Sequence, residues 1–123
     1  MQTIHPIHKG ATGSAVANLH KGLLFIYFHE SGISPDNRRA LRDRLAPDVL
    51  NETYGDATTE LVGMFQYQLK NWPNYFHPLP RELADKIRTT FGPLLGSSGR
   101  GNGDVDLITA EALNWFIGVL GGR

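Results

Sequence analysis

The sequence of 123 residues contains no cysteine. That absence excludes disulfide bonds, a thiolate nucleophile and a zinc site with cysteine ligands. The chain also lacks an excess of charge of either sign, because twelve Lys and Arg residues balance twelve Asp and Glu residues. A neutral chain has no overall electric field that would attract nucleic acid or an anionic membrane surface. We therefore expect no nucleic-acid partner.

Long apolar segments are missing as well. The longest apolar run, 23–28, is far shorter than the roughly 20 residues that a helix needs to cross a bilayer, so we expect no membrane insertion. No signal peptide is visible, since Met1 to Lys9 carry a single lysine and no apolar stretch follows them. Hydrophobic residues make up 41% of the chain and charged residues 20%, which is typical of a globular protein. This length and balance predict a single domain over residues 1–123.

Apolar residues at helical spacing run through most of the sequence. Val16, Leu19 and Leu23 stand at positions i, i+3 and i+7, the pattern of one buried helix face. Strand-like alternation never lasts for more than a few residues. We therefore predict an all-α fold with core helices at about 14–29, 57–71 and 107–120. The residues expected to fill the core are Leu19, Leu23, Phe65, Leu113 and Phe116.

Two further helices are expected between the core helices, at about 35–46 and 80–91. Ser34 and Pro35 form a start signal for the first, because serine caps free N–H groups and proline fits the first helical position. Proline is expected to end the first helix at Pro47, and Gly92-Pro93 to break the second. The arginines of the first helix indicate a solvated face, with an acidic partner or a phosphate as the alternative: Arg38, Arg39, Arg42 and Arg44.

The glycine, asparagine and aspartate residues of the turns favour structural roles, and the chain shows no catalytic or metal-binding motif. Gly10 and Gly13, three residues apart, predict a tight turn with positive φ angles. Asn102-x-Asp104-x-Asp106 spaces oxygen atoms as a calcium loop does, but Leu107 stands where such a loop needs glycine. We expect these three residues to form caps and turns. Ser97 to Gly103 is predicted to be a mobile loop that binds no phosphate.

The histidines also favour structural roles. His5 and His8 lie in an extended stretch that contains Pro6, so a helical pair of metal ligands is not expected. His20 borders the apolar face of the first helix, where a structural hydrogen bond is its expected role. From the sequence we therefore expect no catalytic residues, no metal site and no cofactor.

Three stretches in order resemble the peptidoglycan-binding-like domain family. They are Ile7-x-x-Gly10-x-x-Gly13-x-x-Val16-x-x-Leu19-His20, then Tyr54-Gly55-x-x-Thr58-x-x-Leu61-Val62-x-x-Phe65-Gln66, then Val105-Asp106-x-x-Thr109-x-x-Ala112-Leu113. The chain differs from the family in having His20 where glutamine is usual and Asn51-Glu52 where Asp-Gly is frequent. The resemblance implies a three-helix core enlarged by two inserted segments, at about 30–50 and 71–102, which could cover or rebuild the ligand groove.

The same resemblance implies a non-catalytic binding module for peptidoglycan or another cell-surface glycan. It implies Tyr54, Gln66 and Tyr67 as the ligand-binding residues and an extracellular or cell-wall location. A second resemblance, to the N-terminal module of large bacterial proteins related to toxin-complex A subunits, implies a different role. In that alternative the domain docks a larger secreted or toxin-like protein onto another protein. Aromatic rings that suit either partner, or the core, are Tyr67, Trp72, Tyr75, Phe76 and Trp115.

Overall fold

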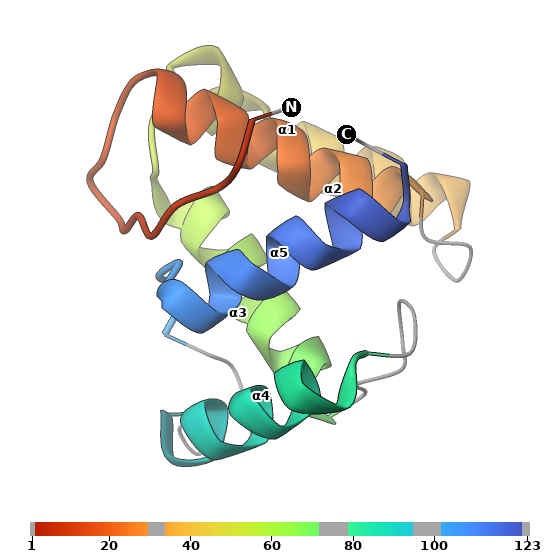
Figure 1. Ribbon diagram of the computed structural model, residues 1–123. Coiled ribbons are helices and arrows are strands. Elements are labelled where there is room, and N and C mark those ends of the chain that lie inside the picture. The colour runs from red at the N-terminus through yellow and green to blue at the C-terminus, as the bar shows by residue number, and fades with distance from the viewer. Residues whose placement is uncertain (1, 30–33, 72–78, 95–101, 122–123) are drawn as a thin grey trace.

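The computed structural model describes residues 2–29, 34–71, 79–94 and 102–121, and over these residues the regular structure is entirely helical. The helices are α1 (Ser14–His29), α2 (Pro35–Leu50), α3 (Asp56–Asn71), α4 (Arg81–Leu94) and α5 (Leu107–Val119), shown in Figure 1. The predicted all-α class is confirmed. In the part of the chain that the structure describes, none of the helices is long and apolar enough to cross a membrane.

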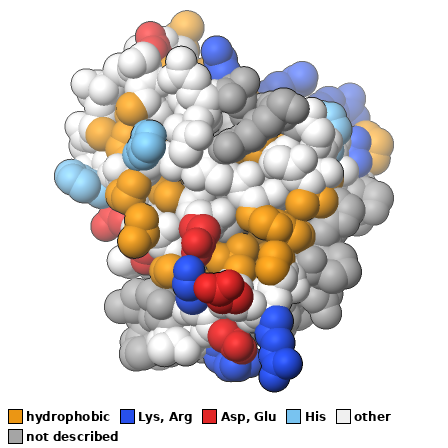
Figure 2. Space-filling view, in the orientation of Figure 1, with side chains coloured by type: hydrophobic (Ala, Val, Ile, Leu, Met, Phe, Trp, Pro, Cys, Tyr) orange, Lys and Arg blue, Asp and Glu red, His pale blue; other side chains and the backbone are white. Residues whose placement is uncertain are grey.

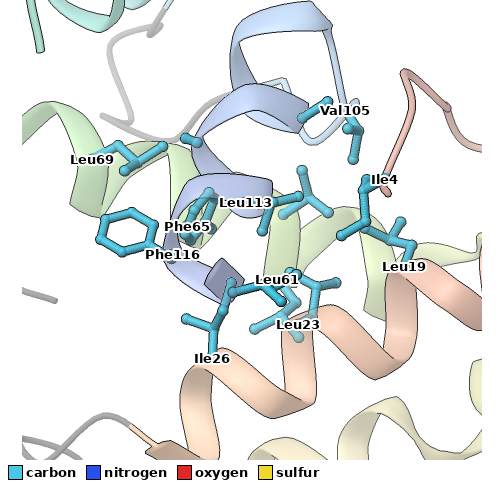
Figure 3. Close-up of a cluster of buried hydrophobic side chains, with 14 of the residues drawn as sticks. Ile4, Leu19, Leu23, Ile26, Leu61, Phe65, Leu69, Val105, Leu113 and Phe116 are labelled. Atoms are coloured by element: carbon cyan, nitrogen blue, oxygen red, sulfur yellow. The ribbon is translucent and has the colours of Figure 1, made fainter. Parts of the chain in front are cut away.

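The hydrophobic core lies where α1, α3 and α5 meet. Figure 3 shows Leu19 and Leu23 of α1 pointing toward the same interior as Phe65 of α3 and Phe116 of α5. The rings of Phe65 and Phe116 meet edge to face, with centroids 6.0 Å apart and planes at 82°. All five residues predicted to fill the core are fully buried, so this prediction is confirmed.

Helix α2 starts as predicted but ends later than predicted. The Ser34 hydroxyl accepts a hydrogen bond from the backbone N–H of Asn37 at 3.2 Å, and Pro35 occupies the first helical position. The expectation that Pro47 ends the helix is wrong, because α2 continues through Pro47 to Leu50. Proline removes one backbone N–H. Asn51, the residue after the helix, stabilises the last turn. Its backbone N–H and its side-chain amide both donate to the Pro47 carbonyl, at 3.2 and 3.0 Å.

Helix α4 also extends beyond its predicted end. The Gly92-Pro93 pair was expected to break it, yet the helical backbone continues through both residues to Leu94. This prediction is wrong by less than one turn. A proline in the last turn of a helix removes only one of its hydrogen bonds, which the earlier turns of α4 do not need.

An extended segment, residues 2–13, precedes α1 and ties the helices together. It forms antiparallel bridges from Ile7 to Val105 and from Thr12 to Thr53. The tight turn predicted for this segment is confirmed, because Gly10 and Gly13 have φ angles of 98° and 103°. The segment therefore joins the start of α1 to the turn before α5 and to the connection between α2 and α3.

Candidate functional site

Two of the three predicted ligand residues, Tyr54 and Gln66, are buried, with exposures of 1% and 2%. The Tyr54 hydroxyl donates a hydrogen bond to the Gly103 carbonyl. The Gln66 side-chain amide donates to the Asp104 carbonyl at 2.8 Å and to the Thr109 hydroxyl at 3.0 Å, and its oxygen accepts from the Gly103 N–H at 3.0 Å. Burial and the nearby Asp104 raise the pKa of Tyr54, so its hydroxyl stays protonated and remains a donor. Both side chains thus fasten the turn before α5, and their polar groups are engaged within the chain.

The turn itself depends on Gly103. Its φ angle of 82° lies in the left-handed region, which favours glycine. A Cβ atom at this position would also lie 2.6 Å from the carbonyl oxygen of Thr59. The prediction of a mobile loop over Ser97 to Gly103 is therefore wrong for Gly103, which is buried and bonded, while residues 97–101 lie outside the described residues.

The acidic and amide residues around this turn act as caps. The Asp106 carboxylate accepts from the backbone N–H of Thr109 at 2.7 Å and caps α5. The Asn102 side chain accepts from the N–H of Asp104 at 3.0 Å. The predicted capping and turn role is confirmed. Among the described residues, no three His, Asp or Glu side chains are grouped as metal ligands.

Tyr67 occupies a different face of α3. It is half-buried, and helical geometry places it about 100° around the axis from Gln66. It follows Met64 by three residues, so these two share one stripe of the helix surface. The structure therefore brings Tyr54 and Gln66 together at the turn and places Tyr67 elsewhere. Of the other aromatic candidates, Trp115 is half-buried against the ring of Phe116, at 5.0 Å between centroids, and 72–78 lie outside the described residues.

A second polar junction connects α1, α2 and α3. His20 of α1 is buried, and its Nε2 lies 2.8 Å from the Thr58 hydroxyl. That hydroxyl donates to the Asp48 carboxylate at 2.6 Å. Because a hydroxyl has one proton, the Thr58 oxygen must accept from His20, which assigns the Nε2–H tautomer. The structural hydrogen bond predicted for His20 is confirmed.

The Asp48 carboxylate serves as the cap of α3 although it belongs to α2. It accepts hydrogen bonds from the N–H groups of Gly55 and Thr58 at 3.1 and 2.9 Å. Burial by itself would raise the pKa of Asp48, but the bonds from Thr58 and Gly55 and the proximity of His20 hold it below the ordinary value. Burial lowers the pKa of His20, against a smaller raising effect of Asp48, so His20 is held neutral. Thr58 is fully buried, so the hydroxyl that joins these groups is closed off from solvent, and its bonds connect α1, α2 and α3.

An open concave surface lies between α2 and α3, with Tyr27 of α1 at its edge. It is a groove of about 270 Å³ with a smaller adjoining hollow of about 50 Å³, and the two share Leu41, Arg44 and Met64. Leu41 and Met64 make the floor apolar, while the rim carries amide and charged groups. The Arg44 guanidinium reaches the Glu60 carboxylate of α3 across the rim at 2.6 Å. The remaining residues that line the larger groove are Tyr27, Asn37, Ala40 and Gln68.

A further hollow, of about 320 Å³, lies between residues 4–6, α4 and α5. Figure 2 shows this side of the molecule, where hydrophobic side chains gather beside acidic and basic ones. Lys86 of α4 and Glu111 of α5 form an ion pair of 3.3 Å at the hollow, and Leu107 is 71% exposed beside them. Each hollow is lined by residues from more than one element, which is why patterns within single helices did not reveal them.

Comparisons of the chain with protein-family models, with curated proteins and with solved structures found no match.

Proposed function

We propose that this chain is a non-catalytic binding module whose ligand, peptidoglycan or another cell-surface glycan, occupies the groove between α2 and α3. The observation that carries the proposal is the composition of that groove, which combines an apolar floor with a rim of amide and charged groups. A sugar ring has apolar C–H faces and polar edges, so it matches this arrangement. The proposal includes an extracellular or cell-wall location for the domain.

Individual groups on the rim suit a cell-wall ligand. The side-chain amide of Asn37 is exposed and can bond sugar hydroxyls. Arg44 can pair with a carboxylate of the ligand, because its present partner Glu60 is a surface residue and such exposed pairs contribute only about 0–1 kcal/mol. Tyr67, on the same stripe of α3 as Met64, extends the surface. In this proposal Tyr54 and Gln66 support the fold behind the groove.

The proposed absence of catalysis has its own support. The groups that could have formed a relay, His20, Thr58 and Asp48, are joined to one another, and the hydroxyl between them is fully buried. At the groove, the charged pair Arg44 and Glu60 is exposed to solvent. A carboxylate in water has no low-dielectric pocket to raise its pKa for acid catalysis.

The test is a pair of matched substitutions on α2. Ala40 lines the groove, whereas Ala46 is exposed on the same helix and does not line it. Ala40→Trp should fill the groove and abolish retention on purified peptidoglycan, while Ala46→Trp should be retained like the unchanged protein. Failure of the unchanged protein to bind at low salt would contradict the glycan proposal. Hydrolysis of labelled peptidoglycan by the domain would contradict the proposed absence of catalysis.

A docking function is the second candidate, and a different feature favours it. Val49 and Leu50, adjacent at the end of α2, are 38% and 84% exposed, and exposed apolar side chains are frequent at protein interfaces. In this alternative the domain attaches a larger secreted or toxin-like protein to another protein. Leu50→Asp should then abolish co-purification with the partner protein, whereas Ala40→Trp, in the groove, should leave it unchanged.

A further inference from the structure

The turn before α5 contains a chemically labile pair of residues, Asn102-Gly103. Of the asparagines in the sequence, only Asn102 is followed by glycine. The backbone nitrogen that follows an asparagine can close a ring with the side-chain amide carbon, and glycine has no side chain to hinder that closure. Asn102 is exposed, whereas Gly103 is buried. The turn therefore offers a modification site of which one half is open to solvent and the other half is closed.

Ring closure converts an asparagine in two steps. The Gly103 nitrogen, once it has lost its proton to hydroxide, bonds to the side-chain carbon of Asn102, and the bond from that carbon to the side-chain nitrogen breaks. The released nitrogen takes a proton from water and leaves as ammonia. Water then opens the ring at either of its two carbonyl groups, which gives aspartate or isoaspartate. One water molecule is consumed and one ammonia released, so no oxidant or reductant is needed.

The fold engages both reacting groups in other bonds. The Gly103 N–H donates to the side-chain oxygen of Gln66 at 3.0 Å, and the Asn102 side-chain oxygen accepts from the Asp104 N–H at 3.0 Å. A hydrogen bond from a neutral group makes the loss of its proton less favourable, and burial of Gly103 keeps hydroxide away from it. Reaction therefore requires that the turn opens locally and frees the Gly103 N–H.

We propose that Asn102 is a site of spontaneous conversion to aspartate and isoaspartate, and that the bond from Gly103 to Gln66 sets the rate. Glycine is required in this turn, because its φ angle is 82° and a Cβ atom would lie 2.6 Å from the Thr59 carbonyl oxygen. The labile pair is thus a consequence of the turn, and Gln66 of α3 suppresses its reaction. Neither residue of the pair lines the groove between α2 and α3, so the proposal does not depend on glycan binding.

The two products change the turn differently. Aspartate keeps the oxygen that accepts from the Asp104 N–H, but it adds a negative charge beside the Asp104 carboxylate. Isoaspartate adds one carbon atom to the main chain immediately before Gly103. The Gly103 N–H then no longer lies where Gln66 accepts it, so conversion to isoaspartate should keep the turn open.

The unchanged full-length protein provides the first test. It is incubated in mildly alkaline buffer, folded or unfolded in urea, and peptides from both samples are analysed by mass spectrometry. Conversion of Asn102 should be at least about a hundredfold slower in the folded chain, because only the opened turn reacts. In urea Asn102 should react faster than Asn51, whose ring closure is hindered by the side chain of Glu52. Equal rates in the folded and unfolded chain, or the reverse order of the two asparagines, would overturn the proposal.

Two buried side chains that bond the same glycine supply matched variants. Gln66→Met removes the acceptor of the Gly103 N–H, whereas Tyr54→Phe removes a bond to the Gly103 carbonyl and leaves the N–H engaged. Gln66→Met should accelerate conversion of Asn102 in the folded protein at least about tenfold, because the N–H loses its partner. Tyr54→Phe should accelerate it much less. Equal acceleration by both variants would contradict the role given to Gln66.

A third variant separates the bond from global stability. Leu113→Ala weakens the core, but an apolar side chain makes none of the hydrogen bonds of the turn. While its helical circular dichroism persists, Asn102 should react as slowly as in the unchanged protein. Acceleration equal to that of Gln66→Met would show that loss of stability, and not the bond, sets the rate.

Hydrogen exchange covers the case in which Gln66→Met does not fold. Exchange of the Gly103 amide and conversion of Asn102 both require the same opening of the turn. In the unchanged protein, both rates should therefore rise together as urea is added below the unfolding transition. Rapid exchange at Gly103 in a protein whose Asn102 stays unmodified would overturn the proposal.

Discussion

Helices α5 and α2 are attached to the same α-helical core in opposite ways. Of its thirteen residues α5 buries six, which are Thr109, Ala110, Ala112, Leu113, Phe116 and Ile117. Of its sixteen residues α2 buries only Leu45. Beyond that leucine, α2 is fastened by the Asp48 carboxylate, which caps α3. A helix attached by so few groups covers its neighbour incompletely, and the groove between α2 and α3 is the result.

One wall of the proposed ligand site is therefore joined to the core by far fewer buried side chains than α5 is. Met64, the part of the groove floor on α3, is well supported, because the other side of that helix carries Phe65 and Leu69, which are fully buried. The wall on α2 is attached by the buried Leu45, the partly buried Leu41, the bonds of Asp48 and the exposed ion pair of Arg44 with Glu60. Substitutions in α2 and in α5 measure how unequally the two helices are held.

The largest difference is expected between two leucines. Leu113 of α5 and Leu45 of α2 are both fully buried, so truncation removes the same atoms from each. Leu113→Ala should cost near the upper end of about 2–5 kcal/mol, since the surrounding core cannot close around the cavity. Leu45→Ala should cost near the lower end, because α2 can shift toward α3. Urea unfolding measures both, and equal costs would show that α2 is as firmly held as α5.

The second prediction concerns the carboxylate that fastens α2. Asp48→Ala leaves the N–H groups of Gly55 and Thr58 without their acceptor and should cost about 1–3 kcal/mol. The matched control is Asp43→Ala, also on α2, whose exposed carboxylate lies 3.9 Å from Arg42. The control should change stability by less than about 0.5 kcal/mol. Equal losses in thermal unfolding would mean that charge on α2, and not the cap, holds the helix.

The acid sensitivity of this attachment follows from the same bonds. The pKa of Asp48 is held below its ordinary value, so the carboxylate stabilises the fold at every pH above that value. Its contribution is lost as the pH falls below about 4, the ordinary value of an aspartate, toward the lowered one. Asp48→Ala should therefore reduce the decline of stability in this acidic range, and Asp43→Ala should leave it unaltered.

The smallest effect is expected from His20. Because burial lowers its pKa, the unfolded chain binds a proton before the folded chain does, and stability falls as the pH drops below about 6.5. His20→Gln keeps a donor for the Thr58 hydroxyl and does not titrate, so the decline of stability between pH 7 and 5 should become smaller. His8→Gln, at an exposed position, is the matched control. An unchanged decline after His20→Gln would contradict the prediction.

The parts of the fold that could be predicted from the sequence are those set by local rules. Ser34 and Asp106 cap their helices as predicted, and the periodic leucines are buried as predicted. The proline rule failed at Pro47 because contacts made by the following residues, Asp48 and Asn51, maintain the helix. Local sequence does not contain those contacts.

The candidate site was less predictable for the same reason. The patterns selected Tyr54 and Gln66, but their partner Gly103 lies 49 and 37 residues further along the chain. Only the folded chain shows that their polar groups are already engaged. The groove is also invisible in the sequence, since its floor and its wall come from different helices.

The hydrogen bonds of Gln66 around Gly103 limit which substitutions these two positions can accept during evolution. Glutamate has the same shape as glutamine but no N–H, so it could not donate to Asp104 and Thr109 and would place a charge against a carbonyl. Any other residue at Gly103 would meet the backbone of Thr59. Diverging copies of the gene should therefore inherit Gln66 and Gly103 together or lose both together, even where exposed residues outside the groove, such as Arg39 and Arg42, have changed.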